Sequence, residues 1–204
     1  MKTIQASVIG NGAVENPNNI LIKKSDIVVR FNKPPGEHLK NYPKTDILVI
    51  SNSSKQTSKL LNTRDYIESP PFRDAPKLVF PYSQEVIQRY MPKPNLFSKI
   101  RGRRADLTNQ CIRAAISTNK EHEILSTQIY HDVCDKLNIE TSHLRSIFPS
   151  SGIMAIQGLL DKFGLNIQVH AFGFGFQGWK HHKWPAERQY MHELATNGII
   201  IMHE

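Results

Sequence analysis

Short β-branched segments, each followed at once by polar residues or a glycine turn, constrain the fold of this chain more than any other feature. An all-helical protein would instead show long runs with a 3.6-residue period. Polar residues at strand ends are typical of open parallel sheets, which bind ligands beyond the carboxyl ends of their strands. The pattern therefore predicts an α/β protein. Three such segments open the sequence: 3–9, ending at Gly10-Asn11-Gly12; 27–31, ending at Asn32; and 47–50, ending at Ser51-Asn52.

The rest of the chain alternates helical and strand patterns. Apolar residues recur at helical spacing over 121–137, which predicts one helix there. Ser150-Ser151 precedes an apolar run that stops at Gly164, which predicts a capped helix over 150–163. We find no internal repeat and no long linker, so the 204 residues predict a single domain, 1–204. Further strands are expected at 78–80, 167–172 and 199–202, and further helices at 83–90, 105–116 and 185–195.

Composition excludes several classes of protein. Hydrophobic residues make up 39% and charged residues 22%, which is a globular mixture and not that of a disordered or collagen-like chain. No run approaches the roughly 18 apolar residues of a membrane-spanning helix, and no signal-peptide pattern opens the sequence. Cys111 and Cys134 form no CxxC pair and have no metal-type spacing. We expect a cytoplasmic protein with reduced thiols.

The net charge of +8 predicts an anionic partner. Five of the cations crowd a Pro- and Gly-containing segment, which predicts a basic loop over about 92–104; they are Lys93, Lys99, Arg101, Arg103 and Arg104. No RNA-binding signature or helix-turn-helix pattern accompanies this loop, so nucleic acid is not the expected partner. It is either a solvated surface or a site of peripheral association with an anionic membrane, which salt would weaken.

The turn Gly10-Asn11-Gly12 follows the first strand and lets backbone amides approach a phosphate or nucleotide. It does not match the dinucleotide fingerprint, because Glu15 stands at the third glycine and Asp26 precedes the second strand instead of ending it. NAD is therefore disfavoured. A plain turn at a strand end is the structural alternative.

Two further groups of polar residues occupy positions suited to a ligand. Arg30 and Asn32 share one face of the second strand, where an amide can read a base or sugar edge, or where both can lie exposed on an edge strand. Ser150-Ser151-Gly152 begins a helix, whose N-terminus favours phosphate or carboxylate, although an ordinary N-cap explains the same residues.

Glycines, aromatic residues and histidines crowd residues 173–188, directly after a predicted buried strand. A histidine in this loop can act as a general base, because its pKa lies near working pH. The histidines lack HExxH spacing and the chain has no Asp-x-Asp pair, so a metal is disfavoured. Packing alone is the remaining alternative for these histidines and tryptophans.

Taken in order, these motifs resemble those of the sialyltransferase family, whose members use CMP-activated acidic sugars. The long motif resembles residues 8–12 (VIGNG) with 26–32 (DIVVRFN), and the small motif resembles 149–155 (PSSGIMA) running to 169–175 (VHAFGFG). The very small motif resembles His182 with Glu187 five residues later. Gly12 stands where the family has Ser, and Lys183 where Asp is common. The cysteine pair that joins the long and small motifs in animal members is absent, as in a bacterial-type relative.

The resemblance implies a GT-A-like, Rossmann-type three-layer α/β/α sandwich with a mostly parallel sheet. It implies that Asn11 and Asn32 contact the CMP moiety and that His182 is the general base. Neither a metal nor another cofactor is implied, and the CMP-sugar is the donor substrate. The other residues assigned to the donor site are Gly10, Gly12, Arg30, Ser150, Ser151, Gly152 and Gly173, with His181 and Glu187 in support.

The leading hypothesis is a metal-independent inverting glycosyltransferase. It would move an acidic sugar, of the sialic acid or Kdo type, from its CMP ester to a hydroxyl of a bacterial glycan or lipid-linked lipopolysaccharide precursor. One phosphate can be held by a helix N-terminus and hydroxyls, which agrees with the missing Asp-x-Asp. The alternatives are a non-catalytic nucleotide or nucleic-acid binding protein on the same fold and a metal-dependent hydrolase that uses the histidines.

Overall fold

The computed structural model describes residues 2–14, 20–36, 43–93, 97 and 105–203. The predicted basic loop over 92–104 lies outside these residues, apart from Pro92, Lys93 and Phe97. Within the described part, no helix is long and apolar enough to cross a membrane. Cys111 and Cys134 are both free and buried.

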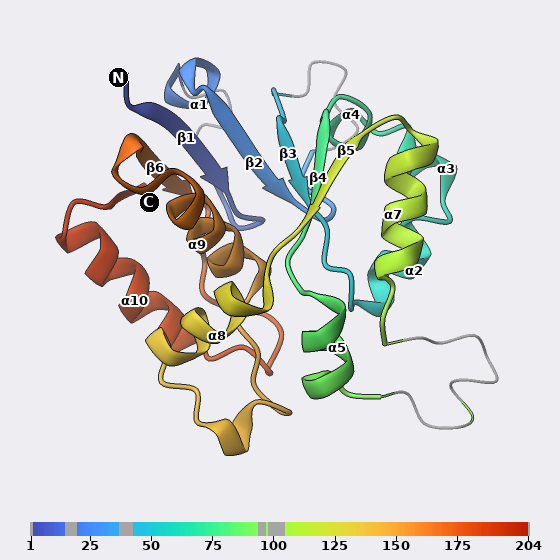
Figure 1. The fold of residues 1–204 in the computed structure, drawn as a ribbon. Helices are drawn as coiled ribbons and strands as arrows, with labels where there is room; N and C mark the ends of the chain where they lie inside the picture. The colour runs from blue at the N-terminus through green and yellow to red at the C-terminus, as the bar shows by residue number, and fades with distance from the viewer. Residues whose placement is uncertain (1, 15–19, 37–42, 94–96, 98–104, 204) are drawn as a thin grey trace.

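One parallel sheet of seven strands forms the centre of the described structure, in the order β5-β4-β3-β2-β1-β6-β7 (Figure 1). Strand β1 lies between β2 and β6, with Ala6 opposite Ile27 and Ile4 opposite Ile167. The chain thus builds outward from β1 in one direction and later returns to β1's other side. This reversal is a topological switch point, where open α/β sheets bind ligands. The strands are β1 Ile4–Ile9, β2 Ile27–Phe31, β3 Ile47–Val49, β4 Lys77–Phe80, β5 Glu121–Ile124, β6 Ile167–Phe172 and β7 Ile200–His203.

Helices cover both faces of the sheet. Successive strand residues point to opposite sides, so each face presents apolar side chains to its own layer of helices. Val29, Val49 and Val79 belong to one core, whereas the neighbouring Leu48 and Leu78 belong to another. The first core is covered by α5 Gln84–Tyr90, α8 Thr127–Lys136, α9 Ser151–Phe163 and α10 Trp184–Thr196. The other face is covered by α1 Ile20–Lys24, α2 Lys55–Leu60, α3 Arg64–Ile67, α4 Pro70–Arg73 and α7 Thr108–Ser117.

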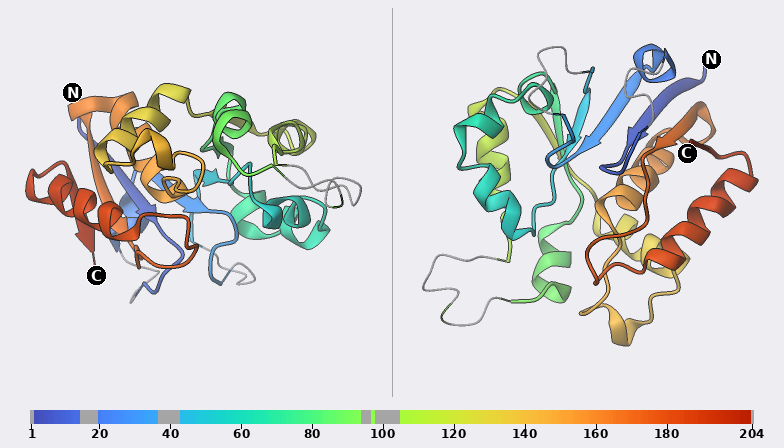
Figure 2. Two further views of the ribbon diagram at one scale, coloured as in Figure 1. Left: turned by 90° about the horizontal axis from the view of Figure 1, so that it is seen from below. Right: turned by 180° about the vertical axis from the view of Figure 1, so that it is seen from behind.

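The result is the expected three-layer α/β/α sandwich of the Rossmann type, which Figure 2 shows from below and from behind. Two short 3-10 turns, Thr141–His143 and Gly164–Asn166, complete the described elements. The strands at 27–31 and 167–172 and the helix that ends at Phe163 match their predicted bounds.

The single helix predicted over 121–137 is wrong. Residues Glu121–Ile124 form edge strand β5, which pairs with β4, and α8 begins at Thr127 after the N-cap Ser126. The apolar residues near Ile124 fit either a helix or a strand, and the pairing with a strand over 40 residues away decides between them. Helices α1 to α4 were not predicted, because each is at most six residues long and shows little periodicity.

Candidate functional site

The glycine turn after β1 lies against the end of β6, at the switch point. Gly10 N donates to Phe172 O at 2.8 Å, and Gly12 N donates to Gly173 O at 3.0 Å. A Cβ added at Gly10 or Gly12 would lie 2.4 or 2.6 Å from Gly173 O, closer than any real contact. The close approach of two backbones therefore explains both glycines. The N–H groups of Gly10 and Gly12 are used in these bonds to the end of β6, so they do not form the expected phosphate cradle. Gly10, Gly12 and Gly173 nevertheless line a cavity.

Asn11 and Asn32 lie side by side at the ends of β1 and β2. Asn11 Nδ2 donates to Phe31 O at 3.2 Å. Asn32 has a positive φ of 49°, and its Oδ1 accepts a hydrogen bond from Ser51 N at 2.9 Å. Its Nδ2 donates to no residue that the structure describes, so this N–H2 group remains available to the cavity. Arg30 is buried, with 5% of its surface exposed, and lines neither of the cavities described below.

The N-terminus of α9 is held by a carboxylate from α10. Glu187 Oε1 accepts from Ser150 N at 2.8 Å, and Glu187 Oε2 accepts from Ser150 Oγ at 2.5 Å. Ser150 Oγ also caps the helix by accepting from Ile153 N at 3.4 Å. Burial raises the pKa of Glu187 to about 7, against the opposing effect of the two Ser150 hydrogen bonds. The Ser150 hydroxyl is therefore occupied by the fold, while Ser151 and Gly152 line the cavity beside it.

His182 is fixed by a backbone carbonyl. Its Nδ1 lies 2.8 Å from Phe148 O, and because a carbonyl oxygen only accepts, Nδ1 carries the proton. Nε2 of the neutral ring is then an acceptor, and no residue that the structure describes donates to it. Burial lowers the pKa of His182, although the Phe148 carbonyl opposes this effect. The imidazole is therefore neutral at pH 7. Trp179 and Trp184 pack against it edge-on, with ring centroids at 5.0 and 4.8 Å.

His181 lies beside His182 in sequence but has a different position. Its Nδ1 donates to Ser146 O at 2.7 Å, and its backbone carbonyl accepts from Phe148 N at 2.8 Å. His181 lines neither cavity. Its contacts fix the segment that carries His182, which gives it a supporting position away from the ligand space.

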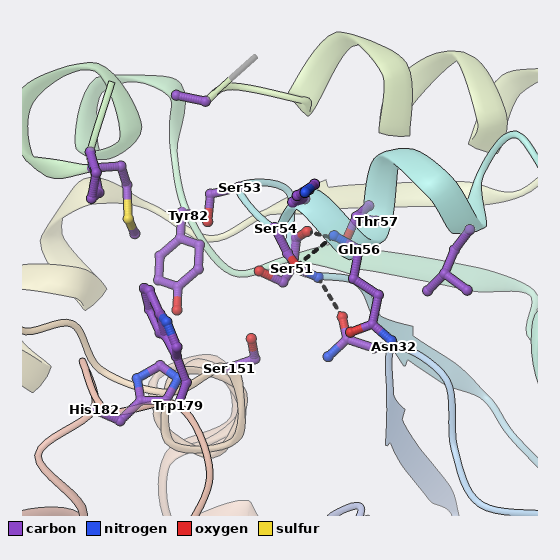
Figure 3. A pocket seen from close by; sticks show the side chains of 15 residues that line it. Asn32, Ser51, Ser53, Ser54, Gln56, Thr57, Tyr82, Ser151, Trp179 and His182 are labelled. Carbon is purple, nitrogen blue, oxygen red and sulfur yellow. Dashed lines mark hydrogen bonds between the residues drawn. The ribbon is translucent and has the colours of Figure 1, made fainter. Parts of the chain in front are cut away.

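Two cavities meet at the carboxyl ends of the strands. The glycine cavity, of about 370 Å³, is lined by residues 10–12, Phe31, Asn32, 150–152, 173–177, His182, Trp184 and Glu187. The hydroxyl cavity, of about 480 Å³, is lined by Asn32, Ser51, 53–57, Leu60, Tyr82, Met91, Pro92, Ala105, Ser151, Trp179 and His182 (Figure 3). Three residues line both cavities, and all three were singled out from the sequence: Asn32, Ser151 and His182.

Sequence reasoning missed most of the hydroxyl cavity. Its wall after β3 includes Ser53, Ser54 and Gln56, which belong to no motif. The polar end of the strand at 47–50 was the one signal that pointed there. Within the described residues, no three His, Cys, Asp or Glu side chains are grouped as metal ligands would be.

Comparisons with known proteins support the fold. No protein-family model matches the chain. The urease operon 23 kDa accessory protein of Rhizobium meliloti (strain 1021) is 26% identical over 201 residues, which are 95% of this chain and 89% of that protein. The chain is also similar to the crystal structure of a mammalian sialyltransferase, with a TM-score of 0.59 and 16% identity. This match covers 98% of this chain and 69% of the sialyltransferase chain. The chain therefore has a sialyltransferase-like, glycosyltransferase-type fold.

Proposed function

We propose that this protein is an inverting glycosyltransferase that moves an acidic sugar from its CMP ester to an acceptor hydroxyl. The sugar is of the sialic acid or Kdo type, and the acceptor is a glycan or lipid-linked precursor of a bacterial surface glycan. One observation carries the proposal: a neutral histidine with a free Nε2 lies where two cavities meet, on a fold of the sialyltransferase type.

We assign the CMP moiety to the glycine cavity. The first turn of α9, a helix of 13 residues, faces this cavity through Ser151 and Gly152. Its unpaired N–H groups and positive dipole end favour a phosphate monoester, so the proposed binding needs no metal. Asn11 and Asn32 contribute amides from the two neighbouring strands. The two cavities then separate the leaving nucleotide from the acceptor.

The reaction follows from this placement. His182 Nε2 removes the proton of the acceptor hydroxyl, whose oxygen attacks the anomeric carbon while the bond from that carbon to the CMP phosphate oxygen breaks. A single displacement from the side opposite CMP inverts the anomeric carbon. Fixing donor and acceptor on either side of one imidazole supplies the orientation that a reaction between two substrates requires.

Nucleotide-dependent thermal stability tests the proposal. A ligand that binds the native state raises the melting temperature by mass action. We expect CMP to stabilise the protein more than UDP or NAD, with and without EDTA, and we expect CMP-sugar to be consumed when acceptors are supplied. Stabilisation by NAD alone, or by a metal that EDTA removes, would contradict it.

A second candidate is a non-catalytic accessory protein that binds a nucleotide on the same fold. The 26% identity to a protein named as a urease operon accessory protein favours it. This candidate predicts binding of CMP without consumption of any CMP-sugar. The two candidates therefore differ in turnover and not in binding.

A further inference from the structure

The hydroxyl cavity presents neutral groups that both donate and accept hydrogen bonds. Among the described residues that line it, Lys55 alone is charged at neutral pH, and this side chain is exposed. The other polar side chains are hydroxyls, amides and the neutral His182. Sugar hydroxyls also donate and accept, whereas a carboxylate or phosphate group only accepts. The described part of the lining is therefore better matched to an uncharged polyhydroxylated ring than to an anion.

Besides Asn32 Nδ2 and His182 Nε2, two side chains in the wall after β3 have unused hydrogen-bonding capacity. Thr57 Oγ1 donates to Ser51 O at 2.6 Å, and Tyr82 OH donates to Pro149 O at 2.7 Å, so these hydroxyls already serve the fold. Ser53 Oγ and the Gln56 side-chain amide have no hydrogen-bond partner within the described part of the chain. In Figure 3 Gln56 lies beside Asn32, across the cavity from Trp179 and His182.

Trp179 gives the cavity an aromatic wall. Its indole stacks on Phe148, with centroids 5.8 Å apart and planes 11° from parallel, and 48% of its surface remains exposed. The buried Phe148 thus fixes the orientation of a half-exposed ring. A flat apolar ring face opposite hydrogen-bonding groups matches a pyranose, which has C–H groups on its faces and hydroxyls around its rim.

We propose that the hydroxyl cavity is a subsite for an uncharged pyranose ring of the acceptor, with Trp179 as its stacking platform and Ser53 and Gln56 as its specificity-determining residues. The assignment of this ring to the acceptor rests on the proposed function. His182 lines both this subsite and the glycine cavity, so a ring held in the subsite can present a hydroxyl to Nε2.

The protein's two tryptophans allow each cavity to be observed separately, since Trp179 lines the hydroxyl cavity and Trp184 the glycine cavity. A Trp184→Phe variant reports on Trp179, and a Trp179→Phe variant reports on Trp184. The probes are the methyl glycosides of galactose, glucose, mannose and N-acetylglucosamine, galactose 6-phosphate, and CMP. We expect at least one methyl glycoside to change Trp179 fluorescence saturably and CMP to change that of Trp184.

Three substitutions in the Trp184→Phe background test the named residues. Ser53→Ala and Gln56→Ala should each weaken glycoside binding by about two- to tenfold, the loss expected for one hydrogen bond. Ser58→Ala is the matched control, because Ser58 lies on α2 outside the cavity lining, and it should leave binding unchanged.

Three results would overturn the inference: no saturable response to any methyl glycoside, equal binding in Ser53→Ala, Gln56→Ala and the control, or preference for galactose 6-phosphate that Lys55→Ala abolishes. Failure of the proposed function is a different result. In that case CMP leaves Trp184 fluorescence unchanged and no CMP-sugar is consumed, while glycoside binding is still measured, since that assay contains no donor.

Discussion

At the scale of single residues, the Phe148 carbonyl determines the chemistry of His182. It fixes the proton on Nδ1 and leaves Nε2 as the acceptor. Burial lowers the pKa of His182, so the base form persists below the usual value of 6.5. We therefore expect the rate of CMP-sugar consumption to stay high down to pH 6.5 and to decrease only at lower pH, as His182 becomes protonated. A rate that rises as the pH drops toward 5 would exclude His182 as the base.

Replacing His182 separates chemistry from binding. His182→Ala should lower the consumption of CMP-sugar by about 10²- to 10⁴-fold, the usual contribution of a general base, while CMP affinity changes by less than about threefold. Initial rates and calorimetric titration with CMP measure the two effects. His181→Ala is the control, because His181 lines neither cavity, and it should retain most activity. Equal losses in both variants would show that the segment's fold, and not the base, had been lost.

Glu187 should make stability depend on pH. Its pKa is raised from 4.5 to about 7 in the folded protein, so the folded state binds more protons than the unfolded state between these values. Its contribution is fully present below pH 4.5 and is lost as the pH rises through about 7, with a magnitude of the order of 3 kcal/mol. Urea unfolding at pH 5, 6, 7 and 8 measures this loss. Glu187→Gln should flatten the decline, and an unchanged slope in that variant would assign the effect to other groups.

At the scale of elements, the contact between the β1 turn and the end of β6 requires glycine. Gly10→Ala would place a Cβ 2.4 Å from Gly173 O, so the turn must separate from β6. We expect a loss of about 2 kcal/mol or more in unfolding free energy, together with loss of stabilisation by CMP. Gly175→Ala is the matched control for stability without ligand, because its nearest neighbour would be Gln177 Nε2 at 3.5 Å. Thermal unfolding without CMP compares the two variants, and equal melting temperatures would contradict the packing argument; the effect of CMP is compared between Gly10→Ala and the unaltered protein.

Helix α9 and strand β5 show which elements can be predicted from the local sequence alone. Ser150 predicted the start of α9, and the cap forms as expected, with Ser150 Oγ accepting from Ile153 N. By contrast, the edge strand β5 was read as the start of a helix, because its pairing with β4 is invisible in the local sequence. Helix signals are local, whereas parallel strands depend on partners far along the chain.

At the scale of the whole molecule, Asn52 joins three parts of the structure around the hydroxyl cavity. This fully buried side chain follows β3, donates to Tyr82 O at 2.7 Å after β4, and donates to Thr108 Oγ1 at 2.8 Å at the start of α7. The backbone carbonyl of Asn52 also accepts from Leu107 N at 2.9 Å. Asn52 therefore fixes the position of Tyr82 in the cavity wall.

Removing this side chain should destabilise the entire domain. Asn52→Ala leaves a buried carbonyl and hydroxyl without their donor, which costs about 1–3 kcal/mol for each unsatisfied group. At about 2–4 °C per kcal/mol for a chain of this size, calorimetry should show a clearly lower melting temperature. Asn62→Ala is the control, because Asn62 bonds Gln110 at the surface, and it should change stability by less than about 0.5 kcal/mol. Equal effects in the two variants would contradict a clamp at Asn52.

The sequence by itself determined the alternation of strands and helices, the glycine turn, the capped helix at Ser150 and the histidine loop, because each is a local pattern of side chains. It also singled out Asn32, Ser151 and His182, which line both cavities in the structure. Only the tertiary structure decided that Glu187 accepts hydrogen bonds from Ser150, 37 residues away in the chain, and that Ser53 and Gln56 line one cavity together with Trp179. These contacts join residues far apart in the chain, so they exist only after the strands have taken their order in the sheet.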